Sequence, residues 1–249
     1  MDFREYLKRI DFTEELIPSL KVLASLQKQH LLNIPFENLD IHYDRPIVLN
    51  KEKIYNKVVL EGRGGFCYEL NGLFYELLLW IGFKCHRVSA RVFDGNDFGA
   101  EFDHLAIAVQ LNGLSYLTDV GFGDFTVTPL LLYPKVIQHD ENGDFRIKRY
   151  GSEFIVYKYI GTEMKPIYKF ENIPRSIDEF SVMCHYHQTN PESHFTQQKL
   201  ISIATEQGRI TLTDDKLKTT KDSSSTESHI KDTEEFKDAL WKYFKIKIT

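Results

Sequence analysis

The first third of the chain places hydrophobic residues with the period of an α-helix. Over 20–32, apolar side chains recur three or four positions apart, and Pro18-Ser19 offers a start for the helix. A second helix is expected from about Lys51, and a third over 67–81, where the apolar stripe is wide. This part of the chain is therefore predicted to be helical.

From Lys84 the period of the hydrophobic pattern changes to two, which is typical of a half-buried strand. Asn112-Gly113 lies between two apolar runs and is a strong signal for a β-hairpin. Asn142-Gly143 is a weaker repetition of the same signal. The middle third is therefore predicted to be β-sheet.

The last third mixes both patterns. Runs typical of strands occupy 200–204 and 209–212, and the polar stretch 219–228 is expected to be a loop or a mobile segment. Over 232–244, apolar residues four positions apart predict a terminal helix that docks on the rest of the chain.

Length and charge narrow the class of protein. The chain has 249 residues, 42% of them hydrophobic, which is enough for a sizeable core and two or three subdomains that share one body. Its 31 basic and 36 acidic residues give a net charge of −5, so no basic surface indicates a nucleic acid or an anionic membrane as a partner. The first residues lack the order of a signal peptide, and no apolar run approaches membrane-spanning length. We therefore expect a cytoplasmic protein.

The three cysteines, Cys67, Cys85 and Cys184, are an odd and sparse set without a CxxC pair. A disulfide framework is therefore not expected, and a reducing compartment is the simpler assumption. His185 and His187 are two positions apart and would share a strand face, which is a weak metal signal; solvated or packed histidines are the favoured alternative. We predict no metal site.

Cys67 opens the third predicted helix directly after the glycine-rich run 61–66. Free amides and the partial positive charge at a helix N-terminus stabilise a thiolate, so this placement suits a nucleophile. The alternative is an ordinary buried thiol. A phosphate-binding loop is a worse interpretation, because the Lys-Ser/Thr ending of the Walker pattern is missing. Cys85 and Cys184 have neither feature and are expected to be packing or surface thiols.

A thiolate nucleophile needs a base, and the base needs a group that orients it. If the first Asn-Gly hairpin has a type I′ turn, its register places His104 and Asp119 on one sheet face as diagonal neighbours, roughly 7 Å apart between backbones. Taken singly, each has a structural alternative: a satisfied buried histidine and a turn residue at a strand end. Periodicity does not determine whether Cys67 approaches His104, because that contact crosses domains.

Several motifs match one family in combination and in order: the chain resembles the arylamine N-acetyltransferases over most of its length. The matching segments are YLKRI at 6–10, IPFENL at 34–39, RGGFCYELN at 63–71, His104, DVGFG at 119–123 and SHFTQ at 193–197. The segment 93–103 departs from many bacterial relatives, since it carries Glu101 and Asp103 in place of a proline-rich, basic sequence.

The resemblance implies an α+β fold with a papain-like Cys-His-Asp arrangement. The implied domains are a helical domain at 1–84 that carries the nucleophile, a β-barrel domain at 85–188 that carries the histidine and the aspartate, and an α/β lid domain at 189–249.

On the family pattern, Cys67 is the nucleophile, His104 its base and Asp119 the orienting acid. Each is the residue that the pattern analysis selected. The resemblance also implies an acceptor pocket lined by Phe36, Val92, Phe122 and Phe195. It further implies that Arg63 and Glu37 form a buried ion pair that holds the cysteine loop.

The implied activity is that of an arylamine N-acetyltransferase of xenobiotic metabolism. Acetyl-CoA, the co-substrate, acetylates the cysteine, and an arylamine or hydrazine then takes the acetyl group in a ping-pong reaction. The alternatives are an acyl-CoA-dependent N-acyltransferase or amide synthase with another donor or acceptor, a cysteine peptidase or transglutaminase, and a catalytically silent small-molecule binding protein. The physiological acceptor and the oligomeric state stay open.

Overall fold

A computed structural model describes residues 1–222 and 224–248 of the chain. Its first part is helical, as predicted. The elements are Phe3–Arg9 (α1), Leu20–Asn33 (α2), Leu39–His42 (α3), Lys51–Tyr55 (α4), a π-helical turn at Asn56–Leu60 and Cys67–Ile81 (α5). The predicted start of α2 is confirmed, because the hydroxyl of Ser19 accepts the N–H of Val22 and caps the helix.

The middle of the chain forms an eight-stranded antiparallel sheet with the order β5-β4-β3-β2-β9-β8-β7-β6. The strands are Lys84–Val92 (β2), His104–Leu111 (β3), Leu114–Thr118 (β4), Leu130–Leu131 (β5), Ile137–Asp140 (β6), Gly143–Tyr150 (β7), Glu153–Ile160 (β8) and Glu163–Glu171 (β9).

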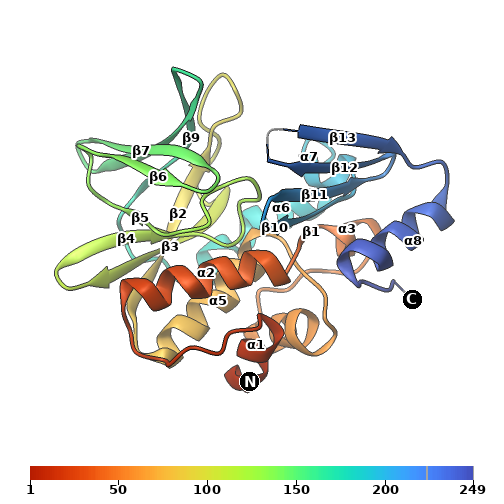
Figure 1. The fold of residues 1–249 in the computed structure, drawn as a ribbon, viewed down its shortest axis with the longest axis horizontal. Coiled ribbons are helices and arrows are strands. Elements are labelled where there is room, and N and C mark those ends of the chain that lie inside the picture. The colour runs from red at the N-terminus through yellow and green to blue at the C-terminus, as the bar shows by residue number, and fades with distance from the viewer. Residues whose placement is uncertain (223, 249) are drawn as a thin grey trace.

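A side chain bridges the two edges of this sheet. Leu131 in β5 donates its N–H to Oε1 of Gln138 in β6 over 2.7 Å, and Nε2 of Gln138 donates to the carbonyl of Leu131 over 2.9 Å. The amide side chain thus replaces a ladder between the edge strands. The sheet curls into the nearly closed barrel that the family resemblance implied (Figure 1).

The first predicted hairpin has the predicted turn. Asn112 and Gly113 have positive φ values of 50° and 78°, as a type I′ turn requires. At the second Asn-Gly pair, Gly143 pairs with Asp140, so the two-residue loop lies one position earlier than the sequence pattern indicated.

The last part of the chain builds a five-stranded sheet with the order β1-β10-β11-β12-β13. The strands are Phe36–Glu37 (β1), Leu200–Thr205 (β10), Gly208–Thr213 (β11), Lys216–Lys221 (β12) and Ser224–His229 (β13). β1 pairs with β10, so this sheet joins the helical first part of the chain to the last part.

The expectation of a loop over 219–228 is wrong. Apart from residue 223, which lies outside the described residues, this stretch belongs to the β12–β13 hairpin, where Thr219 pairs with Thr226. All six residues of β13 are exposed. With neither face buried, the strand carries no hydrophobic alternation, and its backbone ladder with β12 defines it.

The predicted C-terminal helix is confirmed as α8 (Thr233–Phe244). Asp232 caps it by accepting the N–H of Glu235 over 2.9 Å. Phe236 and Leu240 belong to the same buried cluster as residues of the five-stranded sheet, so α8 docks on that sheet.

Along the chain between the two sheets lie a 3-10 turn (Ile177–Phe180), α6 (Ser181–Thr189) and α7 (His194–Gln197). His185 and His187 are on α6, so the expectation that they share a strand face is wrong. Positions two apart point to different sides of a helix, and accordingly His185 is exposed whereas His187 is buried.

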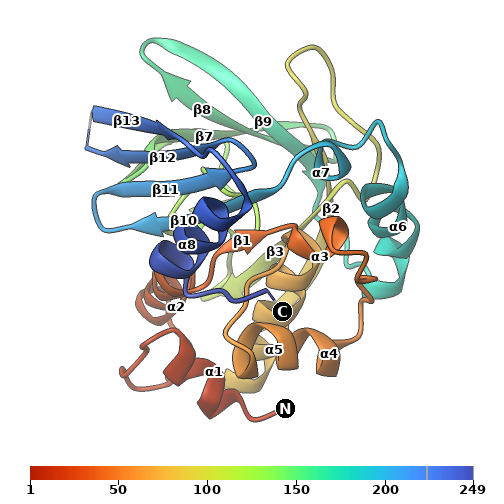
Figure 2. The ribbon, with the colours of Figure 1, turned by 90° about the vertical axis from the view of Figure 1, so that its right-hand side faces the viewer.

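α5 forms the centre of the molecule. Leu70, Phe74 and Leu77 on this helix are fully buried, and the helix contacts β2 and β3. Figures 1 and 2 show α2 and α5 beneath the two sheets, which lie side by side. The first residue of α5 therefore lies where helices and both sheets meet. None of the described helices has the length and apolar character needed to cross a membrane.

Candidate active site

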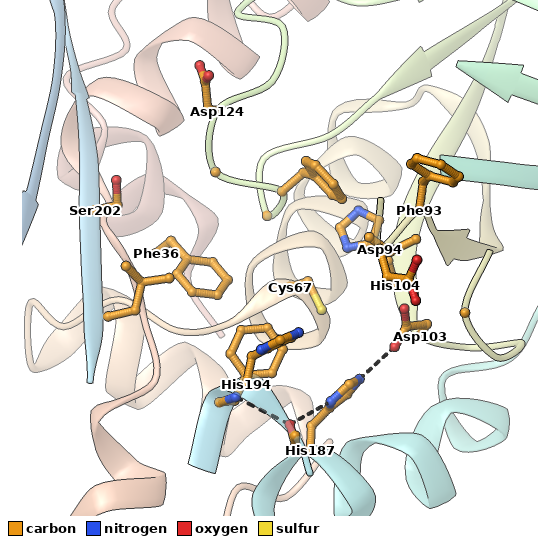
Figure 3. A pocket seen from close by; sticks show the side chains of 18 of the residues that line it. Phe36, Cys67, Phe93, Asp94, Asp103, His104, Asp124, His187, His194 and Ser202 are labelled. Carbon is orange, nitrogen blue, oxygen red and sulfur yellow. Dashed lines mark hydrogen bonds and ion pairs between the residues drawn. The ribbon is translucent and has the colours of Figure 1, made fainter. Parts of the chain in front are cut away.

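A cavity of about 690 Å³ lies where the beginnings of α5 and β3 meet the loop 121–124, the α6–α7 segment and the strands β10 and β11. Cys67, the first residue of α5, and His104, the first residue of β3, both lie on its wall (Figure 3). The tertiary structure thus brings together two residues whose contact the sequence pattern left undetermined.

Glycines allow the loop before Cys67 to pack closely against its neighbours. A Cβ atom on Gly64 would lie 2.0 Å from the carbonyl oxygen of Pro35. A Cβ atom on Gly65 would lie 2.7 Å from Oε2 of Glu69. Larger residues at either position would displace the loop, so the glycines determine where α5 begins and where the thiol lies.

Five buried charged residues hold this loop. Arg63 pairs with Glu37 at 2.7 Å, as the family pattern implied, and also with Asp40 at 2.6 Å. Lys57 pairs with Asp40 at 2.7 Å and with Glu69 at 2.9 Å. Burial works against the charge of Lys57, but the three carboxylates outweigh it and raise the pKa of this amine. Sequence reasoning assigned no role in this cluster to Asp40, Lys57 and Glu69. The feature that could have indicated them is that they are charged residues among positions otherwise suited to burial.

His104 and Asp119 are in direct contact. Nε2 of His104 lies 2.6 Å from Oδ2 of Asp119, and both residues are buried. The β3–β4 ladder ends with the pair Ile107–Thr118, so Asp119 lies one residue beyond β4 in the predicted register. Tyr168 donates its hydroxyl to the same carboxylate oxygen over 3.2 Å. With Nε2 bound to the carboxylate, Nδ1 is the nitrogen left to act as a base.

Asn71 connects the nucleophile's helix to this carboxylate. Its Nδ2 donates to Oδ1 of Asp119 and to the carbonyl of Leu105, each over 2.7 Å, and its Oδ1 accepts the N–H of Val120 over 2.9 Å. Asn71 is fully buried and lies four residues after Cys67. Sequence reasoning included it in a motif without giving it a role.

The thiol of Cys67 is not acidic on its own. Burial raises its pKa well above the ordinary value; a hydrogen bond to the backbone of Leu105 lowers it, and the charges of Asp119 and Asp103 raise it again. These effects oppose the thiolate stabilisation expected from a helix N-terminus. A thiolate becomes favourable here when its proton moves to a neighbouring base, and Nδ1 of His104 is a base on the same cavity wall.

Burial has the largest effect on the pKa of the other two cysteines. Burial raises the pKa of Cys85 and of Cys184 to about 12. Neither is among the described residues that line the cavity. This agrees with the expectation that both are packing or surface thiols.

All four residues expected in an acceptor pocket line the cavity: Phe36, Val92, Phe122 and Phe195. The ring of Phe122 packs edge-on against that of His104, with centroids 5.1 Å apart. Sequence reasoning assigned no cavity role to other residues that line it, because a strand or helix pattern does not show what its residues face: Phe93, Tyr186, His187, Ser202, Arg209 and Thr211.

The part of the cavity formed by β10 and β11 is polar. Arg209 donates to the hydroxyl of Ser202 over 3.1 Å and to the carbonyl of Gly123 over 2.6 Å. Burial lowers the pKa of Arg209. Thr211 adds a second hydroxyl, so this side offers donors that suit phosphate oxygens.

The histidine pair considered as a metal signal has other partners. His187 is hydrogen-bonded to Asp103 and Ser193, and His185 is exposed. Within residues 1–222 and 224–248, no group of three or more histidine, cysteine or acidic residues is arranged to hold a metal ion.

Comparisons with known proteins cover nearly the whole chain. A sequence model of the N-acetyltransferase family matches residues 19–249. The arylamine N-acetyltransferase of Mycolicibacterium smegmatis is 34% identical over 220 residues, which cover 85% of this chain and 80% of that protein.

Solved structures of relatives share the fold. The arylamine N-acetyltransferase of Mycobacterium marinum in complex with CoA superposes with a TM-score of 0.90 at 29% identity, covering 98% of this chain and 93% of that one. The Bacillus cereus enzyme with a Cys-His-Glu catalytic triad superposes with a TM-score of 0.92 at 26% identity over 100% of both chains. On the strength of the family match and of this similarity in sequence and fold, the chain belongs to the arylamine N-acetyltransferase family.

Proposed function

We propose that this chain transfers an acetyl group from acetyl-CoA to the amino group of an arylamine or hydrazine. Cys67 is the nucleophile, His104 the base and Asp119 the orienting acid. One observation supports this most directly: the thiol shares a cavity wall with an imidazole whose Nε2 lies 2.6 Å from a buried carboxylate.

In the first half-reaction, Nδ1 of His104 takes the thiol proton as Sγ of Cys67 attacks the thioester carbonyl. A C–S bond forms on Cys67, the C–S bond to CoA breaks, and the imidazolium returns the proton to the leaving thiolate. Asp119 stabilises the imidazolium, whose charge burial would otherwise disfavour. The N–H of Glu69 in the first turn of α5 donates to the carbonyl of Phe66, so the candidates to stabilise the oxyanion are the N–H groups of Cys67 and Tyr68.

In the second half-reaction, the amine attacks the carbonyl of the acetyl-cysteine. A C–N bond forms, the C–S bond to Cys67 breaks, and His104 carries the amine proton to the departing cysteine sulfur. The thiol is regenerated, so one site serves both substrates in turn.

The residues that line the cavity suit both substrates. Phe36, Phe122 and Phe195 offer aromatic faces and edges for an aryl ring. Ser202 and Arg209 on the polar side offer donors for the phosphates of acetyl-CoA. A CoA complex is known for the related M. marinum enzyme.

The division into domains at 1–84, 85–188 and 189–249 stays a proposal. It is supported by the two sheets, which use separate parts of the chain apart from β1. A cytoplasmic location and the lack of nucleic-acid partners are proposals that rest on sequence alone.

Intact-mass spectrometry of the purified protein tests the proposed reaction. The protein is mixed with acetyl-CoA without an amine, mapped by peptide digestion and then given an arylamine or hydrazine. We expect one acetyl group, confined to Cys67, that the amine removes as the N-acetyl product.

Other outcomes identify the alternatives. An adduct formed only with other acyl-CoA donors would favour a related N-acyltransferase or amide synthase. No adduct with any donor would overturn the proposal and favour a silent binding protein. Hydrolysis of a peptide panel would favour a peptidase.

A further inference from the structure

A second histidine–carboxylate pair lies on the wall of the same cavity. Nε2 of His187, on α6, is 3.0 Å from Oδ1 of Asp103, the residue before His104 (Figure 3). The side chain of His187 is 9% exposed and that of Asp103 is 21% exposed. The proposed mechanism uses neither residue.

His187 is a fixed donor to this carboxylate. Its Nδ1 lies 3.1 Å from Oγ of Ser193, which also accepts the N–H of Phe195. Because an ionised carboxylate only accepts hydrogen bonds, Nε2 of His187 is the donor to Asp103, and in the neutral ring Nδ1 accepts the hydroxyl of Ser193. The ring also packs edge-on against Phe195, with centroids 5.1 Å apart. Both nitrogens are therefore engaged within the protein.

Asp103 is also held from its backbone side. Its carbonyl accepts the hydroxyl of Tyr68 over 3.0 Å, and the preceding Phe102, whose φ is 64°, donates its N–H to Oγ of Ser89 over 2.7 Å. The other carboxylate oxygen, Oδ2, packs over Gly99, where a Cβ would lie 2.9 Å away. No donor among the described residues reaches Oδ2, so this oxygen is available to a ligand in the cavity.

The other carboxylates on the cavity wall are compensated or exposed. Asp124 pairs with Lys158 at 3.2 Å and accepts the amide of Asn142 over 2.6 Å. Asp94 and Glu192 are exposed, where water screens their charge.

Asp103 lies on the same cavity wall as Cys67 and His104. After burial, which is the largest effect on the pKa of the Cys67 thiol, the charges of Asp119 and Asp103 raise it further. Asp119 is occupied by His104, Asn71 and Tyr168, whereas one oxygen of Asp103 is not.

We propose that Asp103, held in place by His187, is a specificity-determining residue that selects acceptor amines by charge. Its free Oδ2 accepts a hydrogen bond from a donor substituent on the amine, attracts a cationic substituent by charge and repels a carboxylate substituent. The inference rests on the proposed function and adds a substrate preference to it. In a partly buried site, opposite and like charges differ strongly in interaction energy, so selection against the wrong substituent follows from the same carboxylate.

Steady-state kinetics with matched arylamines test this. The probes are anilines whose para substituent is trimethylammonium, methyl or carboxylate, each with one nucleophilic nitrogen. For each amine, kcat/KM of the wild type is divided by that of Asp103→Asn, which cancels the intrinsic reactivity of the amine. We expect the preference for the cationic over the anionic aniline to fall at least about tenfold in Asp103→Asn, mainly through KM.

Variants of the other residues separate positioning from general charge. His187→Leu removes the donor and is expected to weaken the charge preference about threefold or more, whereas His187→Gln retains an N–H and restores most of it. Asp94→Asn is the matched control, and we expect its charge preference to stay within about twofold of the wild type, because Asp94 is exposed.

Equal changes for all three anilines in Asp103→Asn, or an effect of Asp94→Asn as large as that of Asp103→Asn, would overturn the inference. Acetylation of Cys67 by acetyl-CoA without amine is followed in parallel by mass spectrometry. If wild-type Cys67 is acetylated while the charge preference is unaltered in Asp103→Asn, this inference fails and the proposed function stands. If wild-type Cys67 is not acetylated, both fail.

Discussion

Asn71 donates a hydrogen bond to Oδ1 of Asp119 over 2.7 Å and thereby connects the helix of the nucleophile to the carboxylate that holds His104. The two residues are 48 positions apart in the chain. One amide thus fixes the position of α5 relative to the beginning of β3.

Replacing Asn71 with leucine tests this connection. The change leaves Oδ1 of Asp119, the carbonyl of Leu105 and the N–H of Val120 each without this partner. We expect a loss of about 2–4 kcal/mol in the free energy of unfolding and a drop in the rate of Cys67 acetylation of at least about tenfold. Urea denaturation measures the loss of stability, and intact mass at quenched time points after acetyl-CoA is added measures the acetylation rate. Wild-type acetylation in a folded Asn71→Leu protein would show that the amide does not position the site.

Gly121 leaves room for the nucleophile's helix. A Cβ at this position would lie 2.8 Å from Cα of Cys67 and 2.8 Å from Nδ2 of Asn71. Gly121→Ala is therefore expected to displace the start of α5, with a cost of about 1–3 kcal/mol in stability and at least about tenfold in acetylation rate. The control is Gly72→Ala on the same helix, where the nearest neighbour is Cδ1 of Ile177 at 3.7 Å and alanine is expected to be tolerated. Equal acetylation rates in Gly121→Ala and Gly72→Ala would show that the start of α5 does not depend on the missing side chain at Gly121.

The reactivity of Cys67 depends on His104. Burial raises the pKa of the thiol, so without the imidazole the thiolate forms only at pH values above the ordinary thiol range. We expect iodoacetamide to label Cys67 rapidly at pH 7 in the wild type and at least about tenfold more slowly in His104→Gln, with the pH profile shifted upward. Asp119→Asn should also slow the labelling of Cys67, because the imidazolium of His104 loses its carboxylate partner. Cys85 and Cys184, whose pKa burial raises to about 12, are the internal controls. If Cys67 in His104→Gln were labelled at the wild-type rate, His104 would not be the base that activates the Cys67 thiol.

Cys67→Ser removes the nucleophilic sulfur and should abolish the acetyl-enzyme. Intact mass after incubation with acetyl-CoA measures this, with Cys184→Ser as the matched control that keeps Cys67. An acetyl adduct that persists in Cys67→Ser would place the acyl group elsewhere and rule out this assignment.

The buried charge cluster makes the cysteine loop sensitive to Lys57. Lys57→Met removes the amine that pairs with Glu37, Asp40 and Glu69, and we expect the protein to lose about 3–5 kcal/mol of stability. Lys53→Met on the exposed side of α4 is the control and should change stability by less than about 0.5 kcal/mol. Urea midpoints of the two variants at neutral pH decide the question. Equal midpoints would mean that the cluster contributes nothing to folding.

His30 makes stability depend on pH. It is fully buried, its Nδ1 is hydrogen-bonded to the hydroxyl of Tyr6 at 2.8 Å, and burial lowers its pKa to about 3. The unfolded chain binds a proton at this residue below about pH 6.5, whereas the folded chain does so only near pH 3. The folded state is therefore destabilised as pH falls through this window, by up to about 1.4 kcal/mol per pH unit from this residue.

His30→Gln retains an acceptor for Tyr6 and removes the titration. Between pH 6.5 and 4, its free energy of unfolding is expected to fall less steeply than that of the wild type, by about 1 kcal/mol per pH unit. Denaturation curves at several pH values measure the difference. Parallel pH dependences would show that His30 does not titrate on unfolding.

The sequence by itself determined the local elements. The extents of α2 and α5 follow from helical periodicity, with Ser19 at the start of α2 and Gly82 at the end of α5. Each cap acts on the helix end next to it in the sequence, so it can be recognised without the tertiary structure. The approach of His104 to Asp119 was also predictable, because a two-residue type I′ turn sets the register of a whole hairpin. The hairpin over β12 and β13 was missed because neither face of β13 is buried, so no hydrophobic pattern records it.

Only the tertiary structure decided which distant side chains meet. The cavity that joins Cys67 to His104, the amide of Asn71 on Asp119, and the pairing of His187 with Asp103 over 84 positions depend on how helices pack on two sheets. Periodicity reports which face of an element is buried, but it carries no information on the neighbour that covers this face. Close packing of those faces sets the distances between their polar groups, and these distances decide the chemistry of the site.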